Sequence, residues 1–233
     1  MRISIWQEFS SNHSSRFTVV GIFETPQKAE LAAAELRHIS QTILDWYDLP
    51  ENAQANEDLE SGEILTPSPP EIQIAAQYGI EWTDPTPDWL WNGELQTFDQ
   101  FVLLHCSKCD FDCQPADALI EKMGGRALID GTVVRDDVFS EVHLTLTCVA
   151  PDEAIAQRLY DDITAYFQGG KRLSFSSFEG KVWRHERALA IEDGRFSNIA
   201  EGLPAVIRHF REAGCHDISY RLAEIRDDEI EAF

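Results

Sequence analysis

Three cysteines and a histidine lie close together near the middle of the chain. Cys106, Cys109 and Cys113 are closely spaced, and His105 directly precedes the first of them. Two thiolates separated by two residues can bind one tetrahedral zinc ion, because the intervening turn directs both sulfurs to one point. Cys113 and His105 would complete four ligands, so these residues are the candidate metal site.

A structural zinc site usually takes its second pair of ligands from a distant segment. In this chain the candidates for the second pair of ligands are His143 with Cys148 and Cys215 with His216. The alternative is that the clustered cysteines are small apolar residues at the end of a strand. No cofactor is therefore favoured, and zinc is the one cofactor that the sequence offers.

Two tripeptides place a histidine two residues before a hydroxyl group. They are His105-Cys-Ser107 and His143-Leu-Thr145, and Thr147 continues the second pattern. On a strand, side chains two residues apart share a face. Paired His-x-Thr/Ser strands resemble the motif of the two-histidine phosphoesterases. That resemblance implies a hydrolase in which one imidazole is the base, the other is the acid, and the hydroxyls hold the phosphate.

The chain departs from that family in two respects. The histidines His105 and His143 are close in sequence for a pair placed one on each lobe, and the strongly acidic charge offers little to a phosphate substrate. Threonine is also simply a favourable strand residue. The sequence therefore leans against an enzyme, no catalytic residue is favoured, and a phosphoesterase-like or metal-dependent hydrolase remains an alternative.

The charge of the chain excludes several classes of protein. Its 233 residues include 19 Lys and Arg against 41 Asp and Glu, a formal net charge of −22. Proteins that bind nucleic acid through phosphates need clustered basic residues, and anionic membrane surfaces attract basic segments. The chain also lacks an apolar run long enough for a membrane span or a signal peptide. We expect a soluble, cytoplasmic protein that binds neither nucleic acid nor membrane directly.

The acidic residues are concentrated in a loop at 51–63, a helix at 151–167 and the tail from 226 to 233. An acidic surface steers a basic partner and raises its association rate, as in inhibitors and immunity proteins that block nucleases. The alternative is that the charge only maintains solubility. The sequence predicts an inhibitor, immunity or accessory-subunit protein that engages a basic protein surface through Glu57, Asp58 and Glu60.

Aromatic residues gather on a proline-containing segment at 78–98. Tryptophan is a common anchor residue of protein interfaces, although such side chains can also cover the core of their own lobe. The candidate anchors for a partner are Trp82, Trp89 and Trp91.

Hydrophobic periodicity predicts the secondary structure that must position these residues. We expect helices over 26–46, 71–78, 115–123, 151–167 and 198–213, and strands over 16–23, 101–106, 142–149 and 218–225. The segment 126–134 is expected to contain a strand and a turn around Asp130-Gly131. Another turn at Glu179-Gly180 is expected to join strands over 173–178 and 182–191.

The strand–Pro–helix pattern RFTVVGIF-ETPQKAELAAAEL is similar to VHLTLTCV-APDEAIAQRLYDDI farther along the chain. We therefore predict an α+β protein with an internal duplication: two tandem ferredoxin-like (βαββαβ) lobes. Lobe 1 covers 1–138, with the acidic loop at 50–70 and the aromatic insertion at 78–98, and lobe 2 covers 139–233. A single mixed α+β domain is the alternative architecture. A small-molecule-sensing module between the lobes is a further alternative function.

Overall fold

The computed structural model describes residues 14–52, 70–80, 95–109, 114–133, 138–167 and 178–226. Within these ranges the chain is a mixed α+β protein with one antiparallel sheet of eight strands and five α-helices. The strands are β1 (Ser14–Ile22), β2 (Leu95–Phe98), β3 (Phe101–Cys109), β4 (Arg126–Val133), β5 (Val138–Val149), β6 (Phe178–His185), β7 (Ala188–Phe196) and β8 (His216–Arg226). The helices are α1 (Pro26–Tyr47), α3 (Pro70–Tyr78), α4 (Gln114–Lys122), α5 (Glu153–Phe167) and α6 (Ile199–Glu212), with a 3₁₀ turn at Pro50–Asn52.

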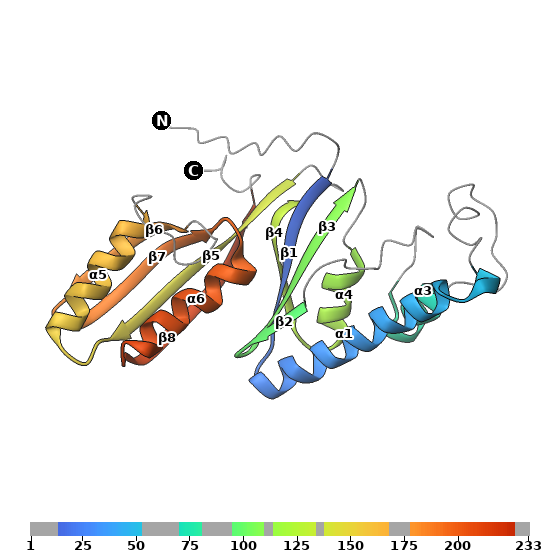
Figure 1. Ribbon diagram of the computed structural model, residues 1–233, viewed down its shortest axis with the longest axis horizontal. Coiled ribbons are helices and arrows are strands. Elements are labelled where there is room, and N and C mark those ends of the chain that lie inside the picture. Colours follow the sequence, from blue (N-terminus) through green and yellow to red (C-terminus); the bar gives the residue numbers. More distant parts are fainter. Residues whose placement is uncertain are drawn as a thin grey trace.

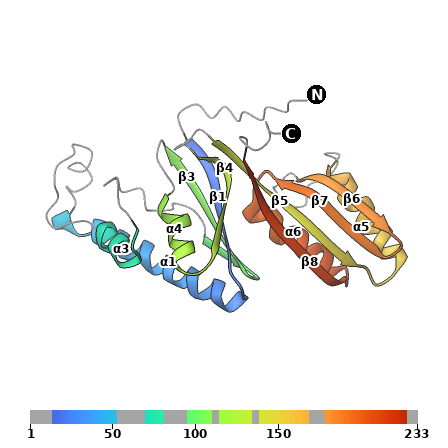
Figure 2. The ribbon, with the colours of Figure 1, turned by 180° about the vertical axis from the view of Figure 1, so that it is seen from behind.

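The sheet divides into a first half, residues 14–133, and a second half, residues 138–226. The strands run in the order β2-β3-β1-β4 in the first half, and β5 pairs with β7 and β8 in the second, giving β6-β7-β5-β8. Figure 1 shows the two halves as separate groups of strands and helices. In the view from behind, α1 and α4 again lie on the side of β1 and β3 that faces away from the second half (Figure 2).

The halves are joined where β5 passes between β4 and β8. Ser140 of β5 is paired with Gly131 of β4 and also with Arg226 of β8. The β4–β5 ladder covers only 131–133 and 138–140, whereas the β5–β8 ladder extends from Ser140 to Val149. The sheet therefore forks at this point, and β8 replaces β4 as the partner of β5.

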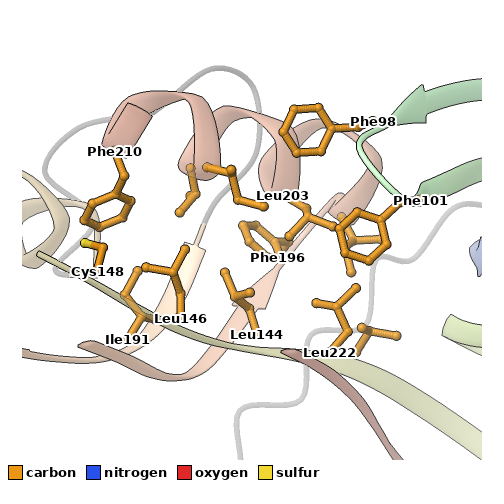
Figure 3. Close-up of a cluster of buried hydrophobic side chains, with 14 of the residues drawn as sticks. Phe98, Phe101, Leu144, Leu146, Cys148, Ile191, Phe196, Leu203, Phe210 and Leu222 are labelled. Carbon is orange, nitrogen blue, oxygen red and sulfur yellow. The ribbon is translucent and has the colours of Figure 1, made fainter. Parts of the chain in front are cut away.

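Two buried cores follow from the alternation of side chains along the strands. The first lies between α1, α4 and one face of the first half, with Val19, Leu36 and Leu104 fully buried. The second lies under α5 and α6 and contains Leu144, Leu146 and Phe210. It also contains residues of the opposite face of the first half: Val20, Phe98, Phe101, Leu103 and Leu128. Figure 3 shows Phe98 and Phe101 among side chains of the second half, so the halves share one core.

Local sequence signals explain the helix boundaries. Thr25 caps α1 by accepting a hydrogen bond from the Lys28 N–H at 3.2 Å, and Pro26 follows at the first helical position. Asn198 caps α6, accepting from the Ala200 N–H at 3.1 Å. Gly214, with φ of +80°, follows the end of that helix. The expected helices are thus confirmed.

Two predicted turns are wrong. The chain continues as strand β4 through Asp130 and Gly131, because β1 pairs with both residues. Gly180 lies at an irregularity inside β6, and the hairpin turns instead around Glu186, which has φ of +51°. Glycine permits either a bulge or a turn, so the residue type alone did not distinguish them. Strand β2 was missed because it has only four residues.

No helix in the described ranges is both long enough and apolar enough to cross a membrane.

Candidate functional site between the two halves

The turn between β2 and β3 extends from the first half toward the second. It consists of Asp99 and Gln100, and Asp99 adopts φ of +50°, a left-handed conformation that aspartate tolerates in turns. The Gln100 carbonyl accepts a hydrogen bond from the Phe23 N–H at 2.9 Å. The backbone of the turn is thus held to the first half.

Helix α6 presents two arginines to this turn. Its apolar residues, including Leu203, Val206, Ile207 and Phe210, are buried against the strands of the second half. Arg208 and Arg211 are three residues apart and exposed, so they lie on one side of the helix. The helix therefore holds both guanidinium groups at the junction between the halves.

Asp99 is the acceptor at the centre of this junction. Arg211 Nη1 donates to Asp99 Oδ1 at 3.0 Å, and Nη2 donates to Oδ2 at 2.5 Å. The Tyr220 hydroxyl of β8 donates to the same Oδ2 at 2.7 Å. This is the bidentate geometry in which a guanidinium recognises a planar carboxylate, with a third donor added.

Aromatic rings surround the polar contact. The Cζ atoms of Arg208 and Arg211 lie 5.3 Å and 5.6 Å from the centre of the Phe98 ring, within the range of cation–π attraction. The Phe101 and Tyr220 ring centres are 5.6 Å apart. We call Phe98, Asp99, Arg208, Arg211 and Tyr220 the Asp99 clamp, because they join the β2–β3 turn to α6 and β8.

The electrostatics of the clamp favour an ionised carboxylate. Burial acts to raise the pKa of Asp99, but the hydrogen bonds from Arg211 and Tyr220 outweigh it and hold that pKa below its ordinary value. Burial, together with the hydrogen bond to Asp99, raises the pKa of Tyr220 to about 12. Tyr220 therefore stays protonated and donates to Asp99 at neutral pH.

A second polar cluster lies at the fork of the sheet. Asp130 Oδ1 accepts a hydrogen bond from the Val142 N–H at 2.9 Å. Glu224 Oε2 accepts from the Ile129 N–H at 3.0 Å, and its Oε1 accepts from the Ser140 hydroxyl at 3.1 Å. Carboxylates thus satisfy backbone donors that separating strands would otherwise leave without a partner.

His143 is next to this cluster and is engaged by a carboxylate. Only 7% of His143 is exposed, and its Nε2 lies 3.3 Å from Glu141 Oε2. The same Glu141 oxygen accepts from Arg195 Nη1 at 2.9 Å. The Nδ1 atom of His143 is buried without a hydrogen-bond partner. An imidazole in this setting is fixed in place and largely closed to solvent.

The predicted catalytic residues lie on strands that are not neighbours. His105 and Ser107 belong to β3, and strands β1 and β4 lie between β3 and β5 in the sheet. The side chains of His105 and Ser107 are outside the described part of the structure. Thr145 and Thr147 are exposed on β5, whereas His143 is buried. The hydrolase hypothesis remains a prediction.

The side chains of the predicted metal ligands lie outside the described part of the structure. Cys106 and Cys109 belong to β3, paired with Phe17 and Ser14, but their side chains, that of His105 and all of Cys113 are not described. Within the described ranges, no group of three or more His, Cys, Asp or Glu residues could hold a metal ion.

The second pairs considered for that metal site lie on β5 and at the start of β8, in the second half. Cys148 is 3% exposed and packs in the core of the second half. It is five residues from His143 on one strand, so their side chains point to opposite faces. Cys215 packs against the same core, and burial raises the pKa of the Cys148 and Cys215 thiols. Both thiols are therefore weak nucleophiles.

The residues predicted to bind a partner are also outside the described part: Glu57, Asp58, Glu60, Trp82, Trp89 and Trp91. The two aromatic residues at the described ends of this segment make contacts within the chain. The Tyr78 hydroxyl donates to Glu35 Oε1 at 2.6 Å, and Phe98 is 8% exposed within the clamp.

Sequence reasoning missed the Asp99 clamp. Asp99 is separated from Arg211 by 112 residues and from Tyr220 by 121. The available signals were an aspartate between two phenylalanines, in Phe98-Asp-Gln-Phe101, and two arginines three residues apart on an amphipathic helix. Neither feature by itself indicates that Asp99 pairs with Arg211.

No protein-family model and no curated protein matches the chain. The chain is weakly similar to several solved structures, including the following two. One is described as "Unknown Protein from Galdieria sulphuraria", with 10% identity, a TM-score of 0.25 and coverage of 91% of this chain and 98% of that one. The other is described as "putative glycine cleavage system transcriptional repressor", with 10% identity, a TM-score of 0.24 and coverage of 92% and 99%. Overlays this weak do not establish a common fold.

Proposed function

We propose that this chain is a non-catalytic binding protein whose acidic surface engages a basic surface of a protein partner, as an inhibitor, immunity protein or accessory subunit. The supporting observation is the large excess of carboxylates, 41 Asp and Glu against 19 Lys and Arg. Ion pairs with Lys or Arg among the described residues include those of Glu24, Asp99, Glu141 and Asp193. Because carboxylates outnumber basic residues by 22, the chain cannot neutralise all of them internally, and negative charge is available to act on another molecule.

The architecture proposed to carry this surface is a tandem pair of ferredoxin-like lobes, with the boundary near residue 138. Each half has the element order β-α-β-β-α-β, with the short helix α3 added in the first. The strand orders β2-β3-β1-β4 and β6-β7-β5-β8 are equivalent, and both correspond to the split βαβ arrangement. This correspondence supports an internal duplication.

Helix α5 is the described part of the proposed binding surface. Glu153 and Asp161 are exposed on it, and Asp152 is exposed just before its first turn. None of these three carboxylates is within ion-pair distance of a described Lys or Arg. Across 178–226, by contrast, basic and acidic residues balance. The negative potential is thus expected to come from α5 and the acidic segments named above.

The test compares the natural chain with charge variants. The partner is captured from untreated lysate, identified and purified, and its association rate is measured at several salt concentrations. Lysine at Glu57, Asp58 and Glu60, or Glu153→Gln with Asp161→Asn, should slow association and weaken its salt dependence. Asp152 is left unchanged because its carboxylate accepts from the Ile155 N–H at 2.8 Å and stabilises the helix start.

A matched control removes charge from the balanced part of the chain. Glu186→Gln and Glu212→Gln also remove two exposed carboxylates, and they should leave the association rate close to that of the natural chain. Association that is unchanged in both sets of acidic variants would contradict steering by these residues. Capture of no basic protein would contradict the proposed function as a whole.

A further inference from the structure

The Asp99 clamp carries more positive than negative charge, although the chain as a whole has a net charge of −22. Two guanidinium groups, Arg208 and Arg211, face a single carboxylate. Among the described residues, no carboxylate lies within ion-pair distance of Arg208, whose guanidinium group lies over the Phe98 ring. The clamp therefore has an arginine available for a second anionic group.

The donors at this site are arranged to recognise a carboxylate. Arg211 binds both oxygens of Asp99, and the Tyr220 hydroxyl binds one of them. Such planar, bidentate recognition is characteristic of arginine and would accept the carboxylate of a ligand in the same way. The side chains of α6 and β8 thus form a carboxylate-binding site, and Asp99 of the same chain occupies it.

Solvent can reach this occupant. The side chains of Asp99 and Arg211 are 24% and 44% exposed, and Asp99 is in a two-residue turn rather than inside a strand. Because the turn backbone is held to the first half through Gln100 and Phe23, the turn stays attached to that half when the Asp99 side chain leaves the site.

We propose that Arg208, Arg211 and Tyr220 form a binding site for a small dicarboxylate, and that Asp99 occupies this site until the ligand displaces it. One ligand carboxylate would take the place of Asp99 on Arg211 and Tyr220, and the other would pair with Arg208. Ligand binding would release the β2–β3 turn from α6 and weaken the connection between the halves. By linkage, a change that releases Asp99 and leaves Arg208, Arg211 and Tyr220 intact would strengthen ligand binding. This site is independent of the acidic surface proposed above.

Succinate is a suitable probe, and its binding is measured by calorimetry at low salt. Asp99→Asn removes the competing internal charge, so it should bind succinate about tenfold more tightly than the natural chain does. Adding Arg208→Gln to that variant should reduce its affinity to that of acetate, which has one carboxylate. The uncharged analogue succinamide should not bind. Arg184→Gln removes an exposed arginine at the β6–β7 turn and should leave succinate binding unchanged.

A second measurement does not depend on Asp99 variants folding. In the otherwise natural chain, Arg208→Gln leaves the Arg211–Asp99 pair intact, yet it should weaken succinate binding. Succinate should also increase deuterium uptake over 95–103 in the natural chain, because Asp99 is released. Equal succinate affinity with and without Arg208, binding of succinamide as strong as that of succinate, or an equal loss in Arg184→Gln would each overturn the proposal.

Discussion

The stability of the Asp130→Asn variant relative to that of the natural chain should be greater at neutral pH than at acidic pH. Asp130 lies at the fork of the sheet and is partly exposed. Burial, together with the charges of Glu141 and Glu224, raises the pKa of Asp130 from 3.8 to about 6. The hydrogen bond from the Val142 N–H acts in the opposite direction but does not cancel this effect.

The sign of the effect follows from proton binding. Between about pH 4 and about pH 6 the folded protein keeps a proton on Asp130 that the unfolded chain has lost, so the free energy of unfolding falls as pH rises. A pKa difference of about two corresponds to about 3 kcal/mol over the full window. Up to about 2 kcal/mol of this is lost between about pH 4.5 and about pH 7.5. Solvent screening at this partly exposed site makes both figures upper values.

Urea unfolding of the natural chain and of Asp130→Asn at the two pH values measures this difference. The asparagine oxygen can still accept from the Val142 N–H, so the backbone contact is retained. The stability of the variant relative to the natural chain should rise by up to about 2 kcal/mol from the lower to the higher pH. If this difference does not change with pH, burial does not keep Asp130 protonated and the reasoning fails.

Glu141→Gln is a control with the opposite sign. The hydrogen bond with His143 and the charge of Arg195 hold the pKa of Glu141 below its ordinary value, although burial opposes them. A lowered folded-state pKa contributes stability above the unfolded-state pKa, and this stability is lost as pH falls. Glu141→Gln should therefore lower the free energy of unfolding most at neutral pH. The same pH trend in both variants would show that urea unfolding reports a general effect of pH and not the titration of these two carboxylates.

Phe101→Ala should cost about 3–5 kcal/mol, because this 1% exposed side chain lies in the core shared by the halves. Hydrogen exchange should then show loss of protection in both halves, whereas Leu31→Ala, at a 65% exposed position, should change stability by less than about 0.5 kcal/mol. Gly202→Ala should lower the melting temperature despite the better helix propensity of alanine, because the added Cβ would lie 2.1 Å from Phe196 Cδ1. Combining Gly202→Ala with Phe196→Leu should recover part of the loss, and a fully stable single variant would contradict the close packing of α6.

The helices could be predicted from the sequence because their signals are local. Thr25 and Pro26 mark the start of α1, Asn198 marks the start of α6, and apolar residues repeat at helical spacing between such points. Long strands with β-branched residues, such as β5, were equally recognisable. The four-residue strand β2 was not recognisable, because its own residues are too few to show a strand pattern and it is defined by its pairing with β3.

A candidate site could be predicted from the sequence only where its reactive residues lie close together in one segment of the chain. Cys106 and Cys109, or His143 and Thr145, attracted attention because their spacing alone suggests a site. Asp99 and Arg211 did not, because an aspartate in a turn and an arginine on a helix are usually exposed, solvated residues.

What the sequence determined by itself is the helices, the long strands, their amphipathic faces and the acidic charge, since all of these depend on nearby residues. The tertiary structure decided where the sheet forks at Ser140 and which face of the first half is covered by the second. It also brought Asp99 to Arg211 and Tyr220 across more than a hundred residues. Such contacts depend on the packing of whole elements, because burying Phe98 and Phe101 against α6 and β8 is what sets the position of the turn between them.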